Sequence, residues 1–264
     1  MRTRKRFAQH FLEGPWAAKL VAAINPAPAD RFIEIGPGRG ALTVPLASRV
    51  DRLLAVEIDR DLAAALTARA LPNVSVILGD VLKADLRELA AQLGPAPVRV
   101  VGNLPYNISS PILLRLLEAS TEGQLVDATI MLQKEVADRL VASPGTSDYG
   151  VLTLTTALRA DVQRLLSLPP GAFRPAPKVH SAVVRLAFRP PPPSVRDPQA
   201  VVELVRAVFQ QRRKTLANAL APLADSRGIK SAAALEAAGI DARRRPETLS
   251  LDDAARLAEA LVRR

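Results

Sequence analysis

The chain has 264 residues, of which 48% are apolar, and a net charge of +10 from 36 Lys and Arg against 26 Asp and Glu. This length fits one large domain or a large and a small one, with enough apolar residues for a packed core. The absence of Cys excludes disulfides, thiolate metal sites and cysteine nucleophiles, and two His residues exclude a multi-histidine metal site. No stretch is long and apolar enough for a signal peptide or a membrane span, so we expect a soluble, cytoplasmic protein.

The first 190 residues alternate short apolar runs with stretches rich in Ala and Leu at helical spacing. This is the pattern of a parallel sheet with crossover helices, and it predicts an α/β fold. We expect strands at residues 31–35, 53–58, 74–78, 98–102 and 127–132, a further pair at 151–159 and 181–188, and helices at 41–49, 61–71, 86–93 and 111–118. In the last of these helices a preceding Ser is expected to cap and Pro111 to take the first helical position.

Four consecutive prolines at residues 190–193 cannot continue a strand or a helix. We therefore expect residues 190–196 to be a stiff linker between a domain of residues 1–189 and a helical domain of residues 197–264. The expected helices of the second domain run from Asp197-Pro198 towards Leu220, over residues 231–238, and onwards from a cap at Ser250.

A glycine-rich turn, Gly36-Pro37-Gly38-Arg39-Gly40, follows the first predicted strand. Glycine suits this place because the backbone must bend sharply and approach a ligand closely. The spacing is G-x-G-x-G and not the G-x-G-x-x-G of dinucleotide sites, and Glu34 stands just before the loop. An acid here favours a ligand with a cationic amine, such as the methionine part of S-adenosylmethionine.

Acidic residues end the next two strands, Glu57 after the second and Asp80 after the third. Glu57 can accept hydrogen bonds from both ribose hydroxyls of a nucleoside, and Asp80 from the exocyclic amine of an adenine. Because the carboxyl ends of parallel strands meet at one edge, Gly36, Glu57 and Asp80 are expected to line one crevice. Each feature alone is compatible with ordinary turn chemistry, but three in register favour a nucleoside cofactor.

The fourth strand is followed by Asn103-Leu104-Pro105-Tyr106. Methylation of an exocyclic amine needs acceptors for the protons of that amine, and the Asn oxygen with the backbone carbonyl before Pro105 supplies them. Tyr106 offers a ring on which an extruded base can stack, a contact worth ~1–3 kcal/mol per base. Direct displacement needs no covalent nucleophile, in agreement with the absence of Cys. The alternative is a capped turn with a buried Tyr.

In order and spacing, segments along nearly the whole chain resemble the ribosomal RNA adenine N6,N6-dimethyltransferase family, closest to its small-subunit (16S) branch. The matching segments are residues 9–12, 34–40, 57, 79–80, 103–106, 133–137, 149–150 and 173–183. The resemblance implies a class I S-adenosylmethionine-dependent methyltransferase, with a Rossmann-like, mostly parallel seven-stranded sheet and a small all-helical C-terminal domain. It also implies dimethylation of two adjacent adenines near the 3′ end of small-subunit ribosomal RNA.

The family's functional residues carry over by position. The resemblance assigns His10, Leu12, Gly36, Glu57, Asp80 and Asn103 to the cofactor, and Asn103, Leu104, Pro105, Tyr106 and Phe173 to the catalytic site. Tyr106 and Phe173 would sandwich the target adenine, with Phe173 held at the pocket mouth by a proline-stiffened loop. The alternative for Phe173 is a plain interstrand loop with a buried ring. The chain departs from the family at His10, where Asn is usual, which leaves that cofactor contact open.

The basic balance suits a polyanion, either a nucleic acid or an anionic membrane surface, although arginine-rich codon usage would give the same charge. With an adenine pocket nearby, clustered cations become candidate phosphate contacts: Arg4, Lys5, Arg6, Lys178, Arg212, Arg213 and Lys214. The implied partner is ribosomal RNA in an immature small subunit. We expect a monomer without a membrane partner.

Two other functions stay open at this point. One is a large-subunit (23S) ribosomal RNA adenine methyltransferase of the macrolide-resistance type. The other is a non-catalytic RNA-binding protein on the same fold, either a ribosome assembly factor or a mitochondrial-type transcription factor. The intact glycine loop, Glu57, Asp80 and the motif at residues 103–106 favour an active enzyme.

Overall fold

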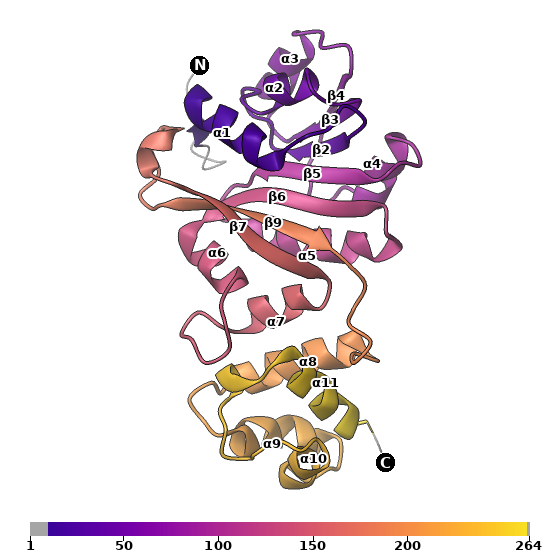
Figure 1. Ribbon diagram of the computed structural model, residues 1–264, viewed down its shortest axis with the longest axis vertical. Helices are drawn as coiled ribbons and strands as arrows, with labels where there is room; N and C mark the ends of the chain where they lie inside the picture. Colours follow the sequence, from indigo (N-terminus) through magenta and orange to yellow (C-terminus); the bar gives the residue numbers. More distant parts are fainter. Residues whose placement is uncertain (1–9, 263–264) are drawn as a thin grey trace. The chain divides into compact units, whose positions relative to one another are not determined.

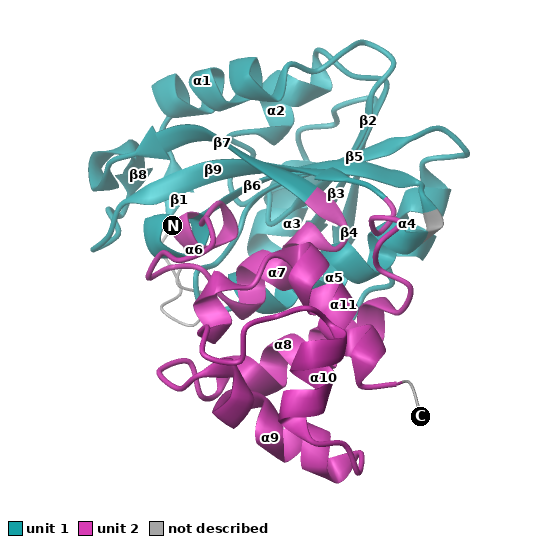
Figure 2. Cartoon of the chain, turned by 60° about the horizontal axis from the view of Figure 1, so that its bottom comes forward, with its two compact units in different colours: residues 1–137, 161–189 teal, residues 138–160, 190–264 magenta. Residues whose placement is uncertain are grey.

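The computed structural model describes residues 10–262, except for the side chain of residue 122. The chain forms two compact units (Figure 2). Unit 1 comprises Met1–Ala137 with Asp161–Arg189, and unit 2 comprises Asp138–Ala160 with Pro190–Arg264. The boundary between the units at residue 190 coincides with the start of the proline run. Residues 138–160, placed in the first domain by the sequence, pack instead with the helices of unit 2.

Unit 1 contains a seven-stranded sheet whose strand order is β4-β3-β2-β5-β6-β9-β7 (Figure 1). Strands β2 to β6 pair in parallel, and β9 runs antiparallel to β6. The strands are β2 (Arg31–Ile35), β3 (Arg52–Glu57), β4 (Val74–Leu78), β5 (Val98–Asn103), β6 (Leu125–Gln133), β7 (Ala160–Leu168) and β9 (Ser181–Phe188). The chain moves outward from β2 to β4 and returns to the other side of β2 with β5. In α/β sheets, ligands bind at the carboxyl ends of the strands beside such a reversal.

Helices of unit 1 follow the strands, and two of them begin at an Asp whose side chain accepts from the first backbone N–H groups. The helices are α1 (Gly14–Ile24), α2 (Thr43–Ala47), α3 (Arg60–Thr67), α4 (Leu86–Gln92), α5 (Ser109–Ala119) and α6 (Lys134–Leu140), which ends in unit 2. Asp59 caps α3 and Asp85 caps α4 through their carboxylates. The predicted cap of α5 was wrong: the helix already includes Ser109, whose hydroxyl donates to the carbonyl oxygen of Tyr106.

The predicted strand at 151–159 was also wrong, because this segment forms helix α7 (Val151–Ala157). Its β-branched residues favour a strand locally, but tertiary packing overrides that preference. Leu154 and Leu158 are buried in the core of unit 2. The hydroxyl of Thr155 bonds to the carbonyl of Val151, so the polar side chain is satisfied within the helix. The strand of this region, β7, follows directly.

Unit 2 packs its helices around one apolar core. The helices besides α7 are α8 (Pro198–Phe209), α9 (Leu216–Ser226), α10 (Ser231–Ala237) and α11 (Leu251–Ala260). Asp197 caps α8 and Ser250 caps α11, as predicted. The helix predicted to run towards Leu220 is two helices, since the polar residues 210–214 have no apolar side chain to bury. The first N–H groups of α9 are satisfied instead by the carbonyls of Arg244 and Ala242.

A buried ion-pair network joins the starts of several strands in unit 1. Arg99 on β5 lies directly opposite Asp127 on β6, with 3.0 Å between Nε and Oδ1. Arg99 also bonds to Asp30 at 2.7 Å and to the carbonyl of Ile24, and Asp127 accepts a further bond from Arg185 on β9. The side chain of Asp127 is only 4% exposed, so this charge depends on its two arginine partners.

Candidate active site

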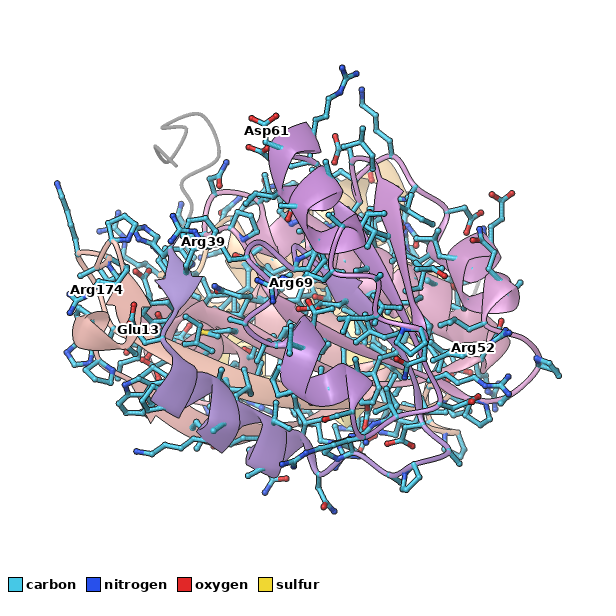
Figure 3. The ribbon with its side chains drawn as sticks, turned by 90° about the horizontal axis from the view of Figure 1, so that it is seen from above. Glu13, Arg39, Arg52, Asp61, Arg69 and Arg174 are labelled. Carbon is cyan, nitrogen blue, oxygen red and sulfur yellow. The ribbon has the colours of Figure 1, made fainter. Side chains whose placement is uncertain are left out.

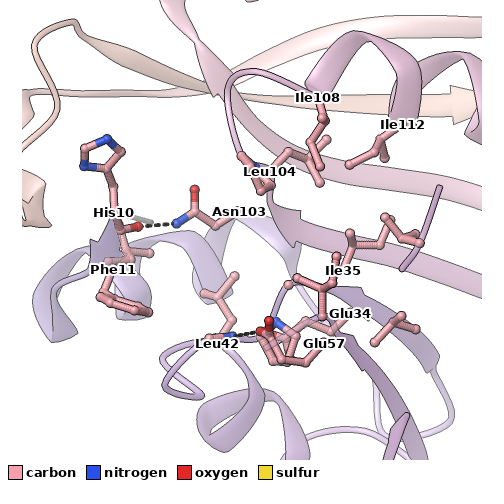
Figure 4. A pocket seen from close by; sticks show the side chains of 18 of the residues that line it. His10, Phe11, Glu34, Ile35, Leu42, Glu57, Asn103, Leu104, Ile108 and Ile112 are labelled. Atoms are coloured by element: carbon pink, nitrogen blue, oxygen red, sulfur yellow. Dashed lines mark hydrogen bonds between the residues drawn. The ribbon is translucent and has the colours of Figure 1, made fainter. Parts of the chain in front are cut away.

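A cavity opens in unit 1 at the carboxyl ends of β2, β3 and β5 (Figure 4). Nine residues that the sequence assigned to the site line it: His10, Leu12, Gly36, Glu57, Asp80, Asn103, Leu104, Pro105 and Tyr106. They come from segments spread over almost a hundred residues of the chain, and the sheet topology brings them together.

The glycine loop turns through the left-handed region, which only glycine adopts without strain. The φ angles of Gly36, Gly38 and Gly40 are 67°, 57° and 78°. Gly38 is also tightly packed, because a Cβ there would lie 3.1 Å from the ring of Phe11. The N–H of Gly38 donates to Oε2 of Glu57 at 2.9 Å, which ties the loop to the end of the neighbouring strand.

Glu57 and Asp80 are held by backbone N–H groups. Oε1 of Glu57 accepts from the N–H of Asp59 at 2.9 Å, so each carboxylate oxygen of this buried residue has a fixed donor. Oδ1 of Asp80 accepts from the N–H of Leu82 at 2.9 Å. Each oxygen retains acceptor capacity, because a carboxylate offers about four lone-pair sites. The geometry therefore suits two oriented acceptors at the cavity wall.

Glu34, next to the loop, is buried at 2% exposure and lines the same cavity. Within the described residues its Oε2 has no hydrogen-bond partner. Burial raises the pKa of Glu34 to about 7, and the nearby charge of Glu57 adds to the effect. A cationic group in the cavity would relieve both causes, so this orphaned carboxyl fits a ligand that carries an ammonium or sulfonium charge.

The Glu34→Gln variant is expected to change how stability depends on pH. The folded-state pKa lies above the ordinary value of 4.5, so the stability contributed by protonated Glu34 is complete below pH 4.5 and is lost as pH rises through 7. The loss is about 3 kcal/mol. Urea unfolding without cofactor at pH 5 to 8 should show the variant gaining that amount over wild type. Glu118→Gln, at an exposed site on α5, is the control, and parallel curves for Glu34→Gln and wild type would contradict this assignment.

Apolar residues to which the sequence assigned no individual role also line the cavity, among them Phe11, Ile58 and Val81. Phe11 lies against the glycine loop, while Ile58 and Val81 follow the acidic residues at the ends of β3 and β4. Ile58 is 46% exposed, so its side chain offers an apolar surface at the cavity wall. The signal that could have found Ile58 and Val81 is an apolar residue directly after each acidic strand end, whereas Phe11 lies within the motif at residues 9–12.

Residues 10–13 form a strap that contacts the glycine loop, the segment before β9 and Asn103. Within it, β1 (Phe11–Leu12) pairs antiparallel with β8 (Phe173–Arg174). The N–H of Glu13 donates to the carbonyl of Ala172 at 2.9 Å, and Arg174 lies 3.9 Å from the Glu13 carboxylate (Figure 3). The guanidinium of Arg39 lies over the Phe11 ring, 4.4 Å from its centre. The strap thus crosses from the glycine loop to the segment before β9.

The side chains of Asn103 and Tyr106 are held by partners outside their motif. Nδ2 of Asn103 donates to the backbone oxygen of His10 at 2.8 Å, which fixes the amide and leaves Oδ1 as an acceptor (Figure 4). The Tyr106 hydroxyl shares a hydrogen bond with Oγ of Ser181 at the start of β9. The side chain of Leu104 is buried, so only its backbone carbonyl can serve a ligand.

The prediction that Phe173 stands at the pocket mouth was wrong. Its side chain is fully buried, at 0% exposure, and packs in the apolar core of unit 1 with residues such as Leu12 and Leu168. The pairing of Leu12 with Phe173 between β1 and β8 explains this position. The alternative of a buried ring in an interstrand loop is therefore the one that the structure supports.

The predicted RNA-contacting cations differ in their exposure and in their hydrogen-bond partners. Arg4, Lys5 and Arg6 lie outside the described residues. Lys178 in unit 1 and Arg213 and Lys214 in unit 2 are exposed. Arg212 is not a free surface cation, because its guanidinium donates to the carbonyls of Ser147 and Thr146 at 2.6 and 2.8 Å. Arg212 therefore fixes the loop before α7.

The sheet order, the glycine loop after β2 and the acidic ends of β3 and β4 define a class I methyltransferase fold, as predicted. A family model for ribosomal RNA adenine dimethylase matches residues 1–262, and the chain belongs to this family. The resemblance seen in the sequence is thereby confirmed.

Individual proteins that are similar to this chain also carry the names of RNA methyltransferases. The ribosomal RNA small subunit methyltransferase A of Leptothrix cholodnii is 50% identical over 218 residues, covering 82% of this chain and 79% of the relative. The crystal structure of a dimethyladenosine transferase from Plasmodium falciparum superposes with a TM-score of 0.79 at 25% identity, covering 94% of this chain and 96% of that one. The 23S rRNA methyltransferase ErmE gives 0.69 at 28% identity, covering 96% and 100%.

Across residues 10–262, none of the helices combines the length and the apolar character needed to cross a membrane.

Proposed function

We propose that this protein transfers methyl groups from S-adenosylmethionine to the N6 amines of two adjacent adenines near the 3′ end of small-subunit (16S) ribosomal RNA. The observation that carries the proposal is one cavity lined both by the loop and acids of a nucleoside site and by the motif at residues 103–106. Relatives that are 45–50% identical to this chain carry the name ribosomal RNA small subunit methyltransferase A, which favours the small-subunit target over the 23S one.

The cavity residues fit S-adenosylmethionine. Glu57 would accept from the ribose hydroxyls and Asp80 from the adenine amine, while Ile58 and Val81 would contact the faces of the ring. The unpartnered Oε2 of Glu34 would lie towards the cationic part. When bound, the cofactor supplies an activated methyl group on a sulfonium. The protein contributes positioning, since an oriented pair of reactants removes much of the entropic cost of a bimolecular step.

Asn103 would hold the target amine. Its Oδ1 and the backbone oxygen of Leu104 accept from the two N–H groups, which keeps the nitrogen lone pair facing the methyl donor. Tyr106 would stack on the extruded base. Because its amide nitrogen is already bonded to His10, Asn103 can present only the oxygen to the substrate, which favours an amine donor over a carbonyl.

The Asp80→Ala variant tests the cofactor assignment. We expect calorimetry to show S-adenosylmethionine binding to the wild type, and binding about tenfold weaker to the variant, because one charged hydrogen bond contributes about 1.5 kcal/mol. Asp161→Ala, at an exposed site on β7, serves as control. Equal affinities for wild type and Asp80→Ala would remove Asp80 from the site, and absence of binding to the wild type would overturn the enzyme assignment.

The target is tested by transfer of labelled methyl groups to small subunits with unmethylated RNA, compared with large-subunit RNA. We expect incorporation only into the small-subunit RNA, with the label mapped to two adjacent adenines. Label in large-subunit RNA would instead support the 23S alternative. Full RNA binding without any incorporation would support a non-catalytic assembly factor.

We further propose that exposed cations of unit 2 contact RNA phosphates. Arg213→Ala combined with Lys214→Ala is expected to weaken RNA binding and lower the slope of log K against log salt by roughly 1.4–1.8, at about 0.7–0.9 per phosphate contact. The matched control is Arg206→Ala with Lys230→Ala, which removes the same charge from exposed sites elsewhere in unit 2. Equal slopes for the two double variants would exclude residues 213 and 214 from the RNA-binding surface.

The proposed setting follows from the target. Ribosomal RNA in an immature small subunit is the proposed partner, and the cytoplasm is the proposed location. The protein would act as a monomer, because a single cavity in unit 1 is lined by residues proposed for both the cofactor and the base.

A further inference from the structure

The target base was expected to lie between Tyr106 and Phe173, but the fully buried Phe173 does not line the cavity. The imidazole of His10 does. Its ring centre lies 5.6 Å from that of Tyr106, and the two planes are 27° apart. This separation is that of two rings in offset stacking and leaves no room for a base between them. One face of Tyr106 is therefore occupied by a residue of the protein itself.

His10 is held in place at two further points. Its Nδ1–H donates to the carbonyl of Pro175 at 2.8 Å, and its backbone oxygen accepts from Asn103 at 2.8 Å. Tyr106 is in turn fixed at its far end by Ser181, which is fully buried. The tyrosine ring is thus restrained on one face by the imidazole and at its hydroxyl by β9, and it lines the cavity.

We infer that His10 is a positioning residue for the target base, and that its imidazole acts through the ring of Tyr106. The adenine would stack on the face of Tyr106 opposite His10, to form a column of imidazole, phenol and base. This inference rests on the proposed function, because it names the residue that orders the base-stacking ring of the same site. His10 supplies order before the RNA arrives, so the base does not have to immobilise the tyrosine.

Three substitutions separate the ring from its hydrogen bond. His10→Phe keeps an aromatic ring and loses the bond to Pro175, His10→Asn can keep a donor and loses the ring, and His10→Ala loses both. With unmethylated small subunits as substrate, we expect kcat to fall about tenfold in His10→Ala and His10→Asn, and to stay within about threefold of wild type in His10→Phe. S-adenosylmethionine is kept saturating, and its affinity for each variant is measured by calorimetry, so that a change in cofactor binding does not enter kcat.

A double-mutant cycle with Tyr106→Ala shows whether His10 acts through the tyrosine. If it does, adding His10→Ala to Tyr106→Ala should cost no further activity in single-turnover assays, because the ring to be ordered is already gone. Urea unfolding of each variant reports any change in stability separately. His10→Ala activity equal to wild type, additive losses in the cycle, or rescue by Asn but not by Phe would each overturn the inference. A wild type that methylates no small-subunit RNA would instead overturn the proposed function.

Discussion

Asn103→Ala is expected to lower the rate of methyl transfer at saturating RNA by about a hundredfold or more. The variant removes Oδ1, the acceptor that would orient the target amine. RNA affinity should change by less than about threefold, since one amide contributes little to a surface governed by phosphate contacts. Single-turnover methylation of small subunits and filter binding of the same subunits measure the two quantities.

A suitable control for this variant is Asn218→Ala, because Asn218 is exposed on α9 and lies in unit 2. It should methylate at the wild-type rate. Cofactor affinity should also be measured, since Asn103 holds the strap through the backbone oxygen of His10. Near-normal turnover by Asn103→Ala would remove it from the reaction. A loss explained wholly by weaker cofactor binding would assign Asn103 to the strap instead.

Asp127→Ala is expected to destabilise unit 1 by about 3–5 kcal/mol, because it leaves two guanidinium groups without their shared carboxylate. Arg99 is the more costly of the two, since its side chain is only 10% exposed. Its remaining partner, Asp30, is 23% exposed and compensates in part. Urea unfolding at neutral pH should show a lower midpoint with an unchanged slope.

The matched comparison is Asp161→Ala, which breaks the ion pair with Arg189 at a site where the Asp side chain is 73% exposed. Exposed pairs contribute about 0–1 kcal/mol, so this variant should unfold close to wild type. If both variants lose the same small free energy of unfolding, the network of Arg99, Asp127 and Arg185 contributes no more to stability than an exposed ion pair.

The parts of the fold that the sequence predicted correctly are those in which local pattern and tertiary environment agree. Strands such as β2 and β5 are buried along nearly their whole length, so their apolar runs carry the signal directly. Helix α7 was missed because its Thr and Val residues favour a strand, while burial of Leu154 and Leu158 in unit 2 decides for a helix. Burial against distant residues is not visible in a local window.

In the site, too, the sequence predicted the residues that a local pattern marks and missed those whose position depends on distant contacts. Glu57, Asp80 and Asn103 were found because each follows a recognisable strand. The role of Arg212 could not be found, since a basic cluster looks the same whether its arginines are exposed or bonded to a loop 65 residues away. The burial of Phe173 depends on two-residue pairing between β1 and β8, which lie about 160 positions apart in the chain and leave no periodic signal.

Strand β5 carries both the buried Arg99 and the site residue Asn103. The two residues are four positions apart, so their side chains lie on the same face of the strand. A shift of β5 by one residue against its neighbours would turn the reactive amide to the opposite face of the sheet. The same shift would also move the guanidinium away from Asp127, its direct partner on β6. The ion pair between Arg99 and Asp127 therefore stabilises the strand register that places the Asn103 amide at the cavity. A chain with β5 in another register would lose this ion pair and be less stable.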